Sequence, residues 1–204
     1  MLWGVPPFII LSFTNFSLYS PSSGLGEFMS NFITAHSRME QLNIPNKWKT
    51  IDNLLYKDYD GSIYLCPRNT ITDGFSIPEF VSFIAGSRMK WDTRASSQHD
   101  FECYYHKVIK VLLTEYELRK MGLLHLHNDI TVCENIPIQF LITYDTGFRE
   151  TNSRFLRMLR TIQSIPEWRA KMMGYAVNLN IDWILKVHNF DINKIYEVNY
   201  ELLK

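Results

Sequence analysis

Two short segments of this sequence hold its densest grouping of side chains capable of chemistry. The first is Thr72-Asp73-Gly74 and the second is Gln98-His99-Asp100. Together they offer two carboxylates and an imidazole, which proteins use for general acid–base catalysis and for binding metal ions. Adjacent residues on a helix point about 100° apart, so His99 and Asp100 do not form a dyad, but both can face one cleft. We therefore take Asp73, His99 and Asp100 as the candidate catalytic residues.

The tetrapeptide that follows the first segment, Ser76-Ile77-Pro78-Glu79, is better explained by helix capping. A Ser three residues before a Glu is a capping box, and proline is tolerated in the first helical turn. The sequence repeats this tetrapeptide at Ser164-Ile165-Pro166-Glu167, again before a helical pattern. The second copy lacks a preceding Thr-Asp-Gly, so any special chemistry in the first copy depends on Asp73.

A third polar cluster is His125-Leu126-His127-Asn128-Asp129. On a strand its alternate side chains share one face, because the side-chain period is two residues. The spacing looks like the His-x-His-x-Asp start of the metallo-β-lactamase fold family, but Ile130 stands where that family continues with another His. We favour polar residues of a loop or surface, with a zinc site as the alternative.

Cys103 follows His99 by four residues, which places both on one face of a helix. This spacing leaves a Cys–His nucleophile pair open, but a buried, apolar cysteine is the favoured interpretation. Arg154, Arg157 and Arg160 form a basic edge on another amphipathic helix. A solvated face or a row of inter-subunit salt bridges explains that edge better than a phosphate-binding track does.

The overall charge argues against some classes of partner. Lys plus Arg and Asp plus Glu number 21 each among 204 residues, so the net charge is zero. A neutral chain has no long-range attraction to nucleic acid or to an anionic membrane, and near-zero charge favours association. The aromatic fraction of 14% is high, which suits protein–protein contacts as well as cores. Three widely spaced cysteines fit a reducing cytoplasm rather than a disulfide framework.

The N-terminal region contains an apolar run at residues 6–13. This run is too short to span a bilayer as a helix. A signal peptide would require basic residues near its start, and no basic residue precedes His36. We expect an aromatic-rich arm that packs on its own domain or on a neighbouring chain.

Periodicity and turn signals predict an α+β fold, in which a small antiparallel sheet packs against several helices. The sheet is expected from Trp48 to Asp73, and residues 123–146 are ambiguous between strand and helix. The predicted helices cover residues 27–42, 78–89, 93–121, 151–165 and 166–185, with a closing strand at 195–198. The predicted organisation is an arm and helix at 1–45, followed by a single α+β domain at 46–204.

The Thr-Asp-Gly-x-Ser-Ile-Pro block followed by His-Asp resembles a phage and prophage family of unknown function, the domain family numbered thirteen fifty-three. The resemblance covers roughly residues 51–101 well and residues 150–177 more weakly. Where that family usually has a late Asp, this sequence reads Thr151-Asn152. An amide can coordinate a cation through oxygen but cannot act as a base, so Asn152 weakens a metal or acid–base site.

The resemblance implies a phage origin and leaves two functions open. The first is a virion-associated structural or assembly protein that binds other phage structural proteins or self-associates through its N-terminal arm. It would reside in the virion, and in the host cytoplasm during assembly. The alternative is a metal-dependent hydrolase of amide or ester bonds, with Asp73, His99, Asp100 and Asn152 around a divalent metal. Neither function calls for nucleic acid or a membrane span.

Overall fold

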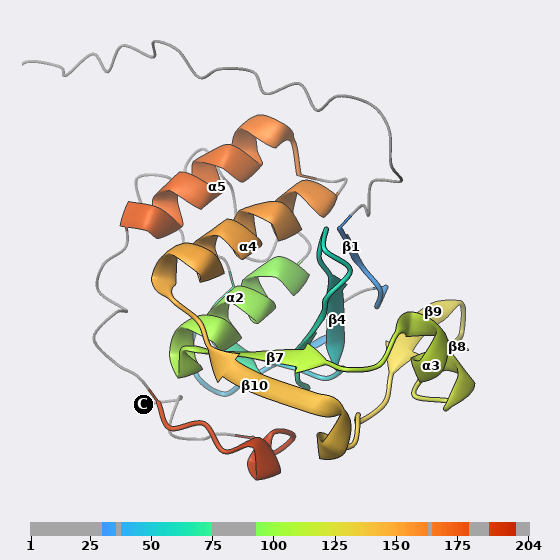
Figure 1. Ribbon diagram of the computed structural model, residues 1–204. Helices are drawn as coiled ribbons and strands as arrows, with labels where there is room; N and C mark the ends of the chain where they lie inside the picture. Colours follow the sequence, from blue (N-terminus) through green and yellow to red (C-terminus); the bar gives the residue numbers. More distant parts are fainter. Residues whose placement is uncertain (1–29, 36–37, 75–92, 163–164, 180–187, 199–204) are drawn as a thin grey trace, which may run out of the picture.

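The computed structural model describes residues 30–35, 38–74, 93–162, 165–179 and 188–198 (Figure 1). It confirms the α+β class. The main sheet is antiparallel and has the strand order β1-β4-β5-β7-β10. Its strands are Asn31–Phe32, Leu54–Lys57, Ile63–Cys66, Lys107–Val111 and Leu141–Asp145.

Two smaller sheets flank the main one. The first has the order β2-β3-β6, formed by Met39–Gln41, Trp48–Thr50 and Ile71–Thr72. The second is the hairpin of β8 (Leu124–His127) and β9 (Ile130–Cys133). Strand β6 follows β5 closely along the chain, so it leads the backbone out of the main sheet toward the helices.

Three helices stack on one side of the main sheet (Figure 1). They are α2 (Arg94–Tyr105), α4 (Phe148–Thr161) and α5 (Glu167–Leu179). Helix α4 contacts both α2 and α5, and α2 also contacts β5, β6 and β7. Helix α2 therefore lies between strands and α4, which explains why so many of its side chains are buried.

The remaining described helical elements are short. Helix α3 (Glu115–Lys120) starts with a capping box, in which the Thr114 and Glu117 side chains each accept the other's backbone N–H. The 3₁₀ turn η1 (Ile138–Phe140) directly precedes β10. A second 3₁₀ turn, η3 (Ile192–Lys194), follows α5 in the last described segment. No helix in the described segments has the length and apolar character needed to cross a bilayer.

The core has two parts. One joins Tyr56 and Tyr64, which face each other across β4 and β5, to residues of α4 and α5 such as Phe155 and Met173. The other joins strand residues to α3, the β8–β9 hairpin and the segment after residue 188. Its members include Leu55, Leu65, Ile109, Leu118 and Ile195. The sheet thus buries side chains on both faces.

Three predicted elements were wrong. The expected helix at 27–42 is replaced, within its described part, by β1 and β2, which pair with β4 and β3. These strands have two and three residues, too few to show a period of two in the sequence. The expected closing strand at 195–198 is a turn region after η3.

The third is the expected long helix at 93–121, which is divided into α2, β7 and α3. His106 ends α2 in the left-handed conformation, with φ of 48°. Val108, Ile109 and Val111 then pair with β10, as β-branched residues prefer. The arm at 1–29 and the predicted helix at 78–89 lie outside the described residues.

Candidate functional site

The Thr-Asp-Gly segment lies at the end of β6. Thr72 pairs with Trp48 of β3 in an antiparallel register and is fully buried. Gly74 has a φ of +77°, a conformation that favours glycine, and its N–H donates to Thr72 Oγ1 at 3.0 Å. Because this N–H already occupies the hydroxyl oxygen as an acceptor, the Thr72 proton is left for another partner.

That partner is Asp100 of α2. The Thr72 hydroxyl donates to Asp100 Oδ2 in a short hydrogen bond between two buried side chains. This bond joins the two segments that the sequence singled out, although 28 residues separate them.

His99 lies beside Asp100 and is held from the opposite side by Asn152 of α4. His99 Nε2 is 2.9 Å from Asn152 Oδ1, and Asn152 Nδ2 donates to Asn178 Oδ1 of α5 at 2.8 Å. Since the Asn152 amino group is used by Asn178, its oxygen accepts and His99 Nε2 carries the hydrogen. His99 Nδ1 is then the nitrogen that titrates, and it faces Asp100 Oδ1 at 3.9 Å. That distance suits an ion pair but is too long for a hydrogen bond.

Burial and neighbouring charges alter the pKa of both titrating groups. Burial, and secondarily the Asp73 carboxylate, raise the pKa of Asp100 to about 6, while His99 and the Thr72 hydroxyl oppose this rise. Burial lowers the pKa of His99, but Cys103 and Asp100 raise it, and the balance lies well above the ordinary value. The Asp100–His99 pair therefore changes charge in the physiological range or close to it.

Cys103 does not form an aligned nucleophile pair with His99. Its sulfur is 3.6 Å from His99 Nδ1 and 3.5 Å from Nε2. A sulfur equally distant from both nitrogens within the ring plane would overlap the Cε1 carbon between them, so it lies beside the ring face. Burial raises the pKa of the Cys103 thiol. These features support the interpretation of Cys103 as a buried, apolar cysteine.

Asp73 is half-buried and lies at the edge of this network. Two residues that the sequence analysis did not single out, Lys47 and Tyr104, lie beside it. The Trp48–Thr72 register places Lys47 across from Asp73. Lys47 Nζ donates to the Tyr104 hydroxyl at 3.2 Å. Burial, and then the Asp100 and Asp73 charges, raise the pKa of Tyr104, so both carboxylates lie near its phenol. Lysine accepts no hydrogen bond, so the Tyr104 proton remains available to a third group.

A buried ion pair fixes α2 against α4 beside this network. Arg154 Nη1 donates to Glu102 Oε2, and the guanidinium lies 4.5 Å from the Tyr64 ring centre. Both side chains of the pair are about 1% exposed or less. Arg154 Nε and Gln98 Oε1 are buried without a hydrogen-bond partner among the described residues. The prediction of a solvated arginine edge was thus wrong for Arg154, whose charge is buried and paired with Glu102.

The other two arginines of that edge are also paired within the chain. Arg157 binds Asp58 through two nitrogens, at 2.9 and 2.6 Å, and Arg160 lies 3.2 Å from Glu167. Both of these partners are intramolecular.

The predicted metal ligands converge in part. His99 is hydrogen-bonded to Asn152 and lies 3.9 Å from Asp100, with Asp73 near Asp100. His99 Nε2 and Asp100 Oδ2 are, however, already used by Asn152 and Thr72. The described residues contain no group of three His, Cys, Asp or Glu side chains placed to hold a metal ion. This arrangement does not fit a metal centre.

The His125–Asp129 cluster forms part of the β8–β9 hairpin. Asn128 and Asp129 make its two-residue turn, with φ of 49° and 65°. Both values belong to the type I′ turn that favours Asn and Asp. His125 lies 3.6 Å from Glu134, and His127 is exposed. Turn geometry and surface exposure account for this polar run.

Comparisons with known proteins add no identification: no family model, curated protein or solved structure matches the chain significantly. The resemblance to the phage family stays a prediction.

Proposed function

We propose that the protein is a hydrolase that cleaves amide or ester bonds by acid–base catalysis centred on Asp73. The observation that carries this proposal is the meeting of Asp73, at the end of β6, with Asp100 and Tyr104 of α2, where burial and Asp73 raise the pKa of Asp100 to about 6. A carboxyl group with a perturbed pKa beside a second carboxyl group is typical of acid–base sites.

Asp73 is the more exposed carboxylate and takes the role of base. It accepts a proton from water as the water oxygen attacks the substrate carbonyl carbon. The carbonyl oxygen gains negative charge and accepts a hydrogen bond from the Tyr104 hydroxyl, which Lys47 polarises. When the carbon–nitrogen or carbon–oxygen bond breaks, Asp73 returns the proton to the leaving group.

Asp100 and His99 are positioning residues that act on Asp73 from the buried side of the site. Below about pH 6 Asp100 holds a proton, which removes a negative charge from the neighbourhood of Asp73. Asn152 keeps the hydrogen on His99 Nε2, so Nδ1 stays directed at Asp100. This role suits their burial, since neither side chain is open enough to bind a substrate directly.

The test is hydrolysis of a panel of p-nitrophenyl esters and fluorogenic peptide amides. We expect Asp73→Asn to reduce kcat by roughly 10²- to 10⁴-fold, as removal of a general base does. Asp129→Asn is the matched control, because Asp129 is exposed in a turn that accepts Asn equally well. Retention of full activity by Asp73→Asn, or no turnover by the unmodified protein on any substrate, would contradict the proposal.

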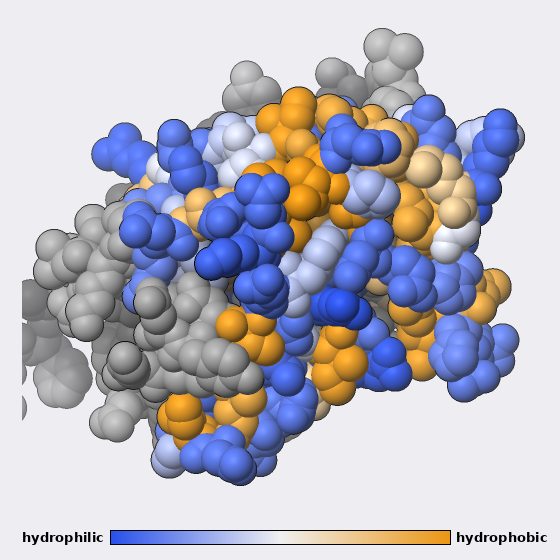
Figure 2. All heavy atoms as spheres, turned by 90° about the horizontal axis from the view of Figure 1, so that it is seen from below, coloured by the Kyte–Doolittle hydropathy of each residue, from blue (hydrophilic) through white to orange (hydrophobic). Residues whose placement is uncertain are grey.

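A second candidate function, protein–protein assembly, is favoured by the edge of the main sheet. Strand β10 is outermost in that sheet, and no described strand pairs with its outer edge. Three exposed apolar residues lie on or beside it, Leu112, Ile138 and Ile142, which we call the edge patch. Figure 2 shows apolar side chains gathered among polar ones on the face seen from below. Under this proposal the protein would be a phage component of the virion, assembled in the host cytoplasm.

A further inference from the structure

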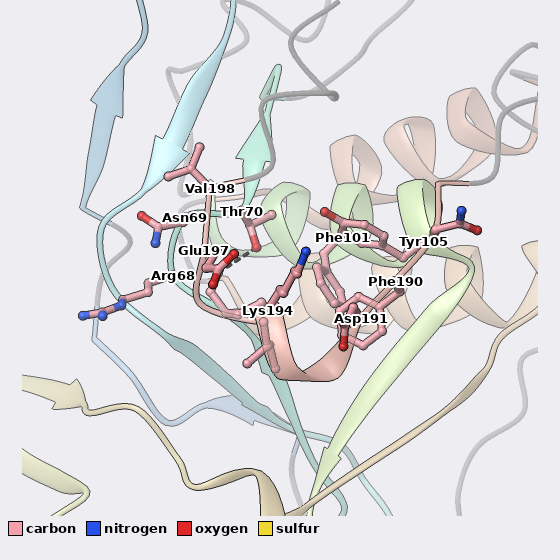
Figure 3. A pocket seen from close by; sticks show the side chains of 13 residues that line it. Arg68, Asn69, Thr70, Phe101, Tyr105, Phe190, Asp191, Lys194, Glu197 and Val198 are labelled. Carbon is pink, nitrogen blue, oxygen red and sulfur yellow. Dashed lines mark hydrogen bonds between the residues drawn. The ribbon is translucent and has the colours of Figure 1, made fainter.

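A pocket of about 460 Å³ lies apart from the carboxylate site (Figure 3). It is enclosed by the turn between β5 and β6, by α2 and by the segment around η3. The lining includes Arg68, Thr70, Phe101, Tyr105, Phe190, Lys194 and Glu197. Its size is within the range of small-molecule sites.

One wall of the pocket is aromatic. The Phe101 and Tyr105 rings are one helical turn apart on α2, with centroids 5.0 Å apart. Phe190 packs edge-on against both, at 5.6 Å from Phe101 and 5.2 Å from Tyr105. Mutual packing against the buried Phe101 ring fixes Tyr105 and Phe190, whose partly exposed rings form a preformed apolar surface for a ring or branched chain.

The facing wall carries two opposite charges, and neither is paired with a described residue. Lys194 and Glu197 are three residues apart, yet no ion pair or side-chain hydrogen bond joins either of them to any described residue. In Figure 3 the Lys194 amino group points toward the space between Thr70 and Phe101, while the Glu197 carboxylate lies on the Thr70 side. Two charges of opposite sign at a pocket mouth, each without a partner in the described part of the chain, match a ligand that carries both signs.

Other charged residues of the pocket are already engaged. Asp191 caps η3 by accepting the Asn193 N–H, and Arg68 lies over the Tyr196 ring at 5.9 Å. In Figure 3 the Arg68 guanidinium points away from the pocket. Lys194 and Glu197 therefore remain the groups directed at a ligand.

We propose that this pocket binds a free α-amino acid with an aromatic side chain. The ligand carboxylate pairs with Lys194, its ammonium group pairs with Glu197, and its ring packs against the partly exposed rings of Tyr105 and Phe190. The proposal is independent of any hydrolase activity at Asp73.

Isothermal titration with L-phenylalanine tests this proposal on the full chain. We expect saturable binding, with at least roughly tenfold weaker affinity for N-acetyl-phenylalanine and for phenylalaninamide, since each lacks one charge. Glycine keeps both charges but lacks the ring, and it should bind more weakly than phenylalanine.

Variants assign the contacts to this pocket. Lys194→Met and Glu197→Gln should each weaken phenylalanine binding by at least roughly tenfold. The exposed residues Lys120 and Glu134 lie outside the pocket, so Lys120→Met and Glu134→Gln should leave the affinity unchanged. Absence of phenylalanine binding, or equal binding of the capped and free ligands, overturns the proposal without any reliance on variants. Binding that neither Lys194→Met nor Glu197→Gln weakens overturns it as well.

Discussion

At the scale of single residues, the main feature is two chains of hydrogen bonds that meet at the Asp100–His99 pair, whose side chains are 3.9 Å apart. One runs from the Gly74 N–H through Thr72 to Asp100, and the other runs from His99 through Asn152 to Asn178. The Thr72 hydroxyl and the Asn152 amide each donate on one side and accept on the other. The Asp100–His99 pair is therefore the place in this network where a proton can be gained or lost.

Replacement of Asp100 by Asn tests this conclusion through stability. The native carboxyl has a pKa of about 6, above its ordinary value of 3.8, so the native state binds more protons than the unfolded state between these values. The corresponding stability is present below about pH 4 and is lost as the pH rises through 6. In Asp100→Asn we expect this loss to be smaller by about 3 kcal/mol, because one pKa unit between the native and unfolded states corresponds to about 1.4 kcal/mol.

Urea unfolding at about pH 4, 5, 6 and 7, a range that spans the native and unfolded pKa values, measures the difference between the two proteins. Asp129→Asn, in the exposed hairpin turn, should follow the unmodified protein at every pH. Parallel pH curves for Asp100→Asn and the unmodified protein would show that Asp100 titrates normally and would remove the basis for a perturbed site.

At the scale of elements, the sequence predicted the helices that depend on apolar periodicity and missed the breaks that depend on partners. The predicted helix at 151–165 corresponds to α4, whose buried Phe155, Met158 and Leu159 recur at helical spacing. The end of α2 could not be predicted, because His106 is neither Gly nor Pro yet adopts a left-handed conformation there. The β-branched run after it was the available signal for β7.

The site was predictable to a similar extent. His99 and Asp100 came from a sequence motif and Asn152 from the family resemblance, and the structure brings the three together. Lys47 joins Asp73 only through the register of β3 and β6, which no local pattern encodes. Tyr104 lies four residues after Asp100, but nothing in the sequence distinguishes it from Tyr105 beside it.

The contact between α2 and α4 depends on the buried Glu102–Arg154 pair, so its removal should be costly. We expect Glu102→Gln to lower the free energy of unfolding by at most about 3–5 kcal/mol, because the buried Arg154 charge keeps only the half-exposed Glu150 carboxylate, 2.7 Å from its Nη2, as an ionic partner. The double variant with Arg154→Met should be more stable than the sum of the single changes predicts, since neither charge is then left alone. Urea unfolding of the four proteins gives the coupling energy.

The exposed pair Arg160–Glu167 is the matched control for this cycle, with side chains 44% and 53% exposed. Its coupling energy should be at most about 1 kcal/mol. Strict additivity at Glu102 and Arg154 would mean that the pair does not act as a unit.

At the scale of the whole molecule, the regions behind the two proposed functions lie at different parts of the main sheet. Its helix-covered side leads to the carboxylate network, and its outermost strand carries the edge patch of Leu112, Ile138 and Ile142. Unpaired strand edges beside apolar side chains favour association with another chain.

If the edge patch mediates assembly, Ile142→Lys should shift the protein toward monomer, because a charge on an edge strand opposes edge-to-edge pairing. Sedimentation velocity over a range of concentrations measures the change. Tyr116→Lys, which places a charge at another exposed position on α3, serves as the control. A monomer at all concentrations in the unmodified protein would count against self-association, and equal association of both variants would place the interface elsewhere.

Helix α2 has a consequence for the order of folding. Six of its nine buried residues are polar or charged, and three of these, His99, Asp100 and Glu102, are ionisable. The partners of Asp100, His99 and Glu102 are Thr72, Asn152 and Arg154, which lie 28, 53 and 52 residues away along the chain. Hydrophobic collapse alone gives this helix no favourable docked state, because its polar groups would then be buried without partners. Strand β6 and helix α4 must already be close before α2 can settle, which makes its docking a late and cooperative event.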